Sequence, residues 1–142
     1  AGIDLDTVKT IVGGVSALAG TTDHGGDRRP PSSDETRPRF VHVLDFTGDA
    51  RASKAPKLAS EISAVLSLPP DLRPVEVILR LKSPGGTVTG YGRCAAELRR
   101  LRSAGIALTA CVDEMAASGG YLMASVADNI YASPFAAVGS IG

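Results

Sequence analysis

The hydroxyl of Ser118 lies among some of the smallest side chains in the sequence, within residues 115–123 (Met-Ala-Ala-Ser-Gly-Gly-Tyr-Leu-Met). Residues 106–112 before it are typical of a buried strand, and residues 119–127 after it are typical of the start of a helix. A serine at such a junction is expected to expose its hydroxyl beside free backbone N–H groups, which stabilise negative charge. An acyl-transfer nucleophile needs this setting, although a helix N-cap is the ordinary role of a serine at this position.

A second turn has the composition of an oxyanion-binding loop. Residues 75–82 form a β-rich run that ends at residues 83–86 (Ser-Pro-Gly-Gly). Consecutive glycines let the backbone turn sharply and leave an amide N–H with no side chain beside it. The N–H groups of Gly86 and Gly119 are therefore candidate donors to a tetrahedral oxygen. The alternative is a tight turn into a helix that begins near Thr89.

Short motifs recur in a characteristic order after residue 40. They are residues 43–48, 83–86, 90–92, 113–121, 126–130 and 137–142. In this order they resemble the signal-peptide-peptidase family of serine peptidases, and they are closer to its SohB branch than to its SppA branch. The similarity covers about residues 40–142, and the first forty positions or so contribute nothing to it.

The resemblance implies a peptidase with a Ser/Lys dyad in the crotonase-like α/β fold shared with the Clp protease, a mostly parallel sheet with helices packed against it. Ser118 falls on the family's nucleophile, and Gly86 and Gly119 fall on its oxyanion amides. The family's general base is a lysine some tens of residues beyond the Gly-Ser-Ile-Gly motif of residues 139–142. No lysine follows Lys82 in this sequence. We therefore expect a fragment that lacks the base and is inactive.

Other basic residues fit the role of general base poorly. His24 and His42 are the only histidines, and His42 reads as an ordinary strand residue. Lys54 and Lys57 are expected on the solvated side of a helix, and Lys82 at the exposed end of a strand. A lysine base must be neutral, and burial in an apolar site lowers its pKa by disfavouring the charged form. The apolar residues around Ser118 suit that requirement; they are Met115, Ala116, Ala117, Leu122 and Met123.

The residues after the Gly-Gly turn are predicted to bind substrate. Thr87, Val88 and Thr89 are expected to form an extended edge, to which a peptide adds as a further strand through main-chain hydrogen bonds. The apolar surroundings of Ser118 then suggest a preference for apolar peptides.

The composition indicates a globular domain without a nucleic-acid partner. The 142 residues include 15 basic and 15 acidic side chains, so the net charge is zero. Arg93, Arg99, Arg100 and Arg102 recur at helical spacing and are expected on a solvated helix face. Neither Cys94 nor Cys111 has a metal-binding spacing, and no metal or cofactor is predicted. The sequence leaves open whether these two cysteines pair.

We expect two zones: residues 1–38 as a short helix and flexible linker, and residues 39–142 as the N-terminal part of a peptidase domain. Strands are predicted at about 39–46, 75–82, 106–112, 129–132 and 136–141, with helices at about 51–66, 90–104 and 118–127. Alternation of strands and helices favours a mostly parallel sheet.

The sequence has no apolar run of the roughly 20 residues that a membrane span needs, so the chain itself is expected to be soluble. The resemblance implies a longer protein, anchored to the bacterial inner membrane with a periplasmic or otherwise extracytoplasmic catalytic domain. It also implies peptide or signal-peptide substrates and a homo-oligomer.

Three functions remain open at this point. The first is a membrane-associated serine peptidase. The second is a crotonase-type acyl-CoA enzyme, which shares the oxyanion geometry and uses carboxylates. The third is a non-catalytic module in which the Ser118 loop serves packing or subunit assembly.

Overall fold

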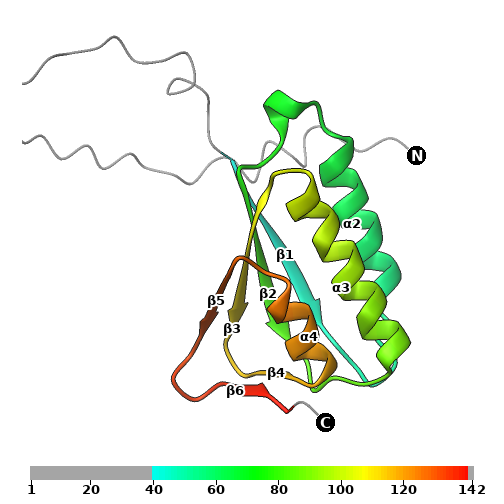
Figure 1. Ribbon diagram of the computed structural model, residues 1–142, viewed down its shortest axis with the longest axis vertical. Helices are drawn as coiled ribbons and strands as arrows, with labels where there is room; N and C mark the ends of the chain where they lie inside the picture. Colours follow the sequence, from blue (N-terminus) through cyan, green and yellow to red (C-terminus); the bar gives the residue numbers. More distant parts are fainter. Residues whose placement is uncertain (1–39, 141–142) are drawn as a thin grey trace, which may run out of the picture. The chain divides into compact units, whose positions relative to one another are not determined.

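The computed structural model describes residues 40–140 (Figure 1). The helix and linker predicted within residues 1–38 lie outside the described residues. The elements in chain order are β1 (Val41–Thr47), α2 (Ala55–Ser67), the 3₁₀ turn η1 (Pro70–Leu72), β2 (Glu76–Lys82), α3 (Val88–Ser103), β3 (Ala107–Val112), β4 (Met115–Ala117), α4 (Gly119–Ser125), β5 (Asn129–Ala132) and β6 (Ala137–Gly139).

The main sheet is parallel throughout, with the strand order β1-β2-β3-β5. Helix α2 connects β1 to β2 and helix α3 connects β2 to β3, as parallel neighbours require. The α/β class predicted from the sequence is therefore confirmed. Strands β4 and β6 form a separate parallel pair, which lies beside the lower ends of β2 and β3 in Figure 1.

One face of the main sheet carries the core. Alternate residues of β2 are buried (Val77, Leu79 and Leu81), because successive side chains of a strand point to opposite faces. The helices cover this face, where α2 and α3 lie side by side and α4 packs against α3 (Figure 1). The opposite face is more open: Val43 is 47% exposed, and Arg80 pairs with Asp45 at 3.3 Å.

Two local predictions differ from the structure. Residues 115–117 form β4, whereas the sequence suggested only a loop before Ser118. The predicted extended edge is wrong, because Val88 and Thr89 form the first turn of α3 and Thr87 is its N-cap. The N–H of Thr87 donates to the carbonyl oxygen of Ala50 at 2.9 Å. The Gly-Gly turn therefore leads directly into a helix, as the alternative interpretation of that turn predicted.

The packing of α3 on the sheet should dominate the stability of the domain. Leu98 on α3 is fully buried, so Leu98→Ala is expected to lower the free energy of unfolding by about 2–5 kcal/mol. Leu72→Ala, at a leucine that is 51% exposed, should cost within about 0.5 kcal/mol. Urea denaturation followed by circular dichroism measures both, and equal losses would contradict this packing.

Candidate active site

A backbone bridge brings together the two turns that the sequence marks for chemistry. The N–H of Ser83 donates to the carbonyl oxygen of Met115 at 2.9 Å, and the N–H of Ala117 donates to the carbonyl oxygen of Ser83 at 3.0 Å. The residue after β2 is thereby joined to β4, which leads into Ser118. The Ser-Pro-Gly-Gly turn and the Ser118 turn consequently lie against each other.

Gly85 makes the contact between the two turns. A β-carbon added to it would lie 2.7 Å from Cβ of Ser118 and 2.8 Å from the backbone nitrogen of Gly119. Its φ of +85° is a conformation that other residues adopt rarely. No side chain fits at this position, so glycine is required both by space and by backbone conformation.

Ser118 is held in a strained backbone conformation, with φ 50° and ψ −116°. Its N–H donates to the carbonyl oxygen of Gly139 at 2.7 Å, and its carbonyl oxygen accepts from the N–H of Leu122 at 3.0 Å. The residue is exposed, and its side chain makes no capping hydrogen bond to α4. Ser118 thus occupies the N-cap position of α4, as the ordinary interpretation expects, but its hydroxyl does not cap the helix. A strained, exposed serine between a strand and a helix is typical of a nucleophile elbow.

The amides predicted as oxyanion donors remain available. Within residues 40–140 no acceptor is found for the N–H of Gly86 or of Gly119, whereas the N–H of Gly85 donates to Ser83 Oγ at 3.1 Å. Gly86 is exposed, and on its inner side a β-carbon would lie 2.6 Å from the carbonyl carbon of Ala50. The two turns thus offer two uncommitted donors and one exposed hydroxyl.

Sequence reasoning gave no role to a hydroxyl pair beneath these turns. Ser83 Oγ lies 2.6 Å from Tyr91 Oη, and the Tyr91 hydroxyl donates to the carbonyl oxygen of Asp49 at 2.8 Å. Both side chains are fully buried. Burial, the largest influence, raises the pKa of Tyr91, so its hydroxyl stays protonated. The only sequence signal was that Ser83 and Tyr91 both belong to motifs of the family resemblance.

Two of the other basic side chains considered as a general base are held in ion pairs. Lys82 Nζ lies 2.5 Å from Glu114 Oε2, and Lys57 pairs with Glu61 at 3.5 Å on α2. His42 lies half-buried on β1, and His24 is outside the described residues. Within residues 40–140, no hydrogen bond joins Lys82, Lys57 or His42 to Ser118.

Residues 40–140 contain no group of three or more His, Cys, Asp or Glu side chains that could hold a metal ion. Cys94 and Cys111 are both free thiols, which settles the pairing that the sequence left open. Burial raises the pKa of the Cys94 thiol, so it behaves as a small core side chain.

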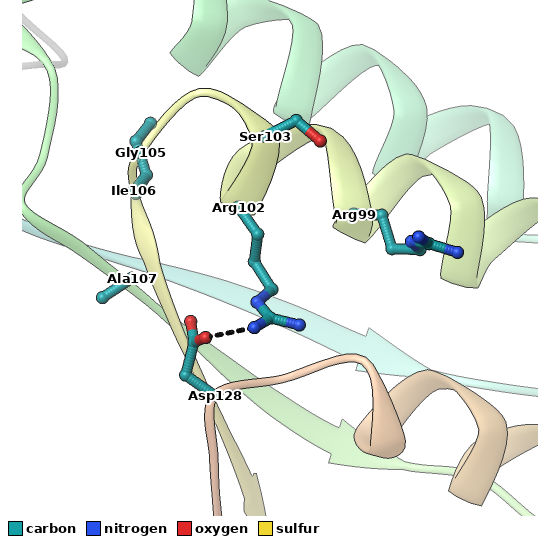
Figure 2. A pocket seen from close by; sticks show the side chains of 7 residues that line it. All are labelled: Arg99, Arg102, Ser103, Gly105, Ile106, Ala107 and Asp128. Atoms are coloured by element: carbon teal, nitrogen blue, oxygen red, sulfur yellow. Dashed lines mark ion pairs between the residues drawn. The ribbon is translucent and has the colours of Figure 1, made fainter.

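A pocket of about 540 Å³ lies at the start of β3 (Figure 2). Arg102 on α3 crosses it to pair with Asp128 at 2.7 Å, and Asp128 also accepts from the N–H of Leu108 at 2.9 Å. The Leu108 N–H is the main reason that the pKa of Asp128 is lowered. Because Ser118 lies beyond the opposite end of β3, this pocket is separate from the candidate site.

Comparison with known families identifies the relationship. The model described as "Peptidase family S49 N-terminal" matches residues 21–98, and "Peptidase family S49" matches residues 100–142. The chain belongs to peptidase family S49. The match begins at residue 21, so the expectation that the first forty positions contribute nothing is wrong for residues 21–39.

Curated relatives of this S49 chain carry protease names. It is 55% identical over 102 residues to "Probable protease SohB" of Haemophilus influenzae, covering 72% of the chain and 28% of that protein. It is 53% identical to "Probable protease SohB" of Buchnera aphidicola subsp. Acyrthosiphon pisum, covering 72% of the chain and 30% of that protein. "Protease 4" of Salmonella typhi is 44% identical over 66 residues, covering 46% of the chain and 11% of that protein. The S49 chain thus spans about a third or less of these relatives.

A solved structure supports the predicted fold. The chain is similar to a crystal structure titled as an enoyl-CoA hydratase/isomerase family member, with a TM-score of 0.50 and 17% identity. The similarity covers 65% of this chain and 43% of that one. It confirms the crotonase-like α/β fold. No helix in the described part of the S49 chain is long and apolar enough to cross a membrane.

The strain at Ser118 has a measurable consequence. Ser118→Gly should be more stable than Ser118→Ala by about 1 kcal/mol or more, because glycine adopts φ 50°, ψ −116° freely and alanine keeps the strain. At Ser60, which is exposed in the middle of α2, the order should reverse by about 1 kcal/mol. Urea midpoints of the four variants test this. The same order at both positions would show that the Ser118 backbone is unstrained.

Proposed function

We propose that the protein containing this chain is a serine endopeptidase and that Ser118 is its nucleophile. The observation that carries the proposal is the exposed, strained Ser118, which packs against Gly85, together with the N–H groups of Gly86 and Gly119, for which no acceptor is found in the described residues. Membership of peptidase family S49 and the protease names of the relatives support it.

The proposed reaction is acyl transfer through a tetrahedral intermediate. Ser118 Oγ attacks the carbonyl carbon of a peptide bond, and the carbonyl oxygen becomes an oxyanion. The N–H groups of Gly86 and Gly119 donate to that oxygen. Each such donor is worth about 10²–10³ in kcat, or roughly 3–4 kcal/mol, because its strength is fully used only in the transition state.

The reaction also needs a base that removes the Ser118 proton and gives it to the leaving amine as the C–N bond breaks. Water then hydrolyses the ester on Ser118, which releases the acyl part of the peptide and restores the hydroxyl. We assign the role of this base to a lysine that follows Gly142 in the longer protein, as the family resemblance implies. The sequence contains no lysine after Lys82, and Lys82 is engaged with Glu114. Leu122 and Ala117 offer an apolar environment on either side of Ser118, in which the pKa of a lysine falls and its neutral form is favoured.

The chain of 142 residues on its own should therefore be almost inactive, since oxyanion donors alone give a small residual rate. The same proposal includes four features that rest on the resemblance alone. They are attachment to the inner membrane, an extracytoplasmic catalytic domain, peptide or signal-peptide substrates, and a homo-oligomeric state. The contact of Thr87, Val88 and Thr89 with substrate stays a prediction, although not as an extended edge.

An acyl-CoA enzyme is the weaker alternative. The fold similarity to an enoyl-CoA hydratase/isomerase family member is compatible with it, but at 17% identity the similarity concerns the fold alone. A strained, exposed serine is the feature that favours a nucleophile. A bound CoA thioester without serine labelling would favour the alternative.

The first test uses the full-length protein. Ser118→Ala should abolish both peptide cleavage and covalent labelling by a fluorophosphonate, because both need the Ser118 hydroxyl. Ser125→Ala, which removes an exposed hydroxyl from α4, is the matched control and should behave as the parent. Cleavage or labelling that survives in Ser118→Ala would refute the assignment.

The second test concerns selectivity. Because Leu122 is 42% exposed one helical turn from Ser118, peptides with apolar side chains near the scissile bond should be cleaved more efficiently than charged ones. Ratios of kcat/KM for matched peptides measure this preference in the full-length protein. A preference for charged peptides would contradict it.

A further inference from the structure

Tyr91 is packed at the junction of the two site turns. It is fully buried, and its ring meets the Phe46 ring edge-on, with centroids 6.3 Å apart and an interplanar angle of 75°. The same side chain lies against Gly119, where an added β-carbon would come within 2.7 Å of Tyr91 Cβ. Gly119 therefore packs directly against Tyr91.

The Tyr91 hydroxyl reaches the other turn through a hydrogen-bond chain with a fixed direction. Its single hydrogen is donated to the carbonyl oxygen of Asp49 at 2.8 Å. Ser83 Oγ must therefore be the donor in its 2.6 Å contact with Tyr91 Oη. Ser83 Oγ in turn accepts from the N–H of Gly85 at 3.1 Å, next to the Gly86 amide.

Two further glycines pack closely around Ser83 in this series of hydrogen bonds. A β-carbon at Gly48 would lie 2.6 Å from Ser83 Oγ, and one at Gly120 would lie 2.9 Å from Ser83 Cβ. In the described part of the chain, every buried side-chain nitrogen or oxygen has a hydrogen-bond partner. Loss of the Tyr91 hydroxyl would leave the hydroxyl of Ser83 without its acceptor, and such a loss is costly in a buried site.

We propose that Tyr91 is a positioning residue for the oxyanion site: its hydroxyl sets the Gly86 amide through Ser83 and Gly85, and its ring sets the Gly119 amide. Tyr91 touches no reacting atom. This inference rests on the proposed peptidase function and deepens it. It identifies one side chain that places both donors on the same oxygen.

The test uses Tyr91→Phe in the full-length protein, a change that keeps the ring and removes only the hydroxyl. We expect kcat to fall by roughly 10- to 100-fold while KM stays within about twofold, because the oxyanion exists only in the transition state. The rate of fluorophosphonate labelling should fall in parallel. Tyr131→Phe removes a hydroxyl from a tyrosine that is 66% exposed on β5, and it should leave both measurements unchanged.

A double-mutant cycle separates positioning from loss of stability. Ser83→Ala should reproduce the Tyr91→Phe defect, and the double variant should be no slower than the worse single variant, because both changes break one hydrogen-bond chain. Urea midpoints establish that each variant is folded at the assay temperature.

The outcomes discriminate between the two proposals. An unchanged kcat in folded Tyr91→Phe, a defect confined to KM, or independent effects in the cycle would overturn the positioning role while Ser118→Ala remains inactive. Cleavage that survives in Ser118→Ala would instead overturn the peptidase assignment itself.

Discussion

The pair of backbone hydrogen bonds between Ser83 and β4 is the constraint on which the site depends. One turn follows β2 and the other follows β4, so nothing local in the sequence holds them together. The 2.9 Å and 3.0 Å bonds on either side of Ser83 fix their register. With that register, Gly85 meets Ser118, and among the described residues no acceptor is found for the N–H of Gly86 or of Gly119. A slip of one residue would turn every side chain of β4 to the opposite face.

Crowding explains why small residues recur in the motifs. Gly48, Gly85 and Gly119 come from different parts of the sequence, yet a β-carbon at each would collide with Ser83, Ser118 or Tyr91. Their shared requirement is close approach of backbone to a neighbouring group, which only glycine permits without displacement. The recurrence of glycine in these motifs therefore reflects the close packing at one junction of the fold.

The sequence predicted the main sheet well, because long β-rich runs separated by helical patterns leave few alternatives to parallel pairing. It missed β4, since the three residues Met115–Ala117 are too short for any period to be visible. It misplaced Thr87–Thr89 because the N–H of Thr87 bonds to Ala50, whose position is set by the distant β1–α2 loop. The Asp49–Tyr91 contact joins residues 42 apart, and no spacing rule finds such a pair.

The backbone conformation of Ser118 is one that serine residues rarely adopt. A serine held at a positive φ costs on the order of 1–3 kcal/mol, and the amides of Gly86 and Gly119 have no acceptor within residues 40–140. A domain is stable by only about 5–15 kcal/mol, so this geometry persists only where the surroundings hold it on several sides. The Gly139 carbonyl holds Ser118 from β6, Leu122 from α4 and Gly85 from the neighbouring turn. These contacts come from separate elements. The strained backbone conformation of Ser118 is therefore held only when the β4–β6 pair and α4 are packed onto the main sheet.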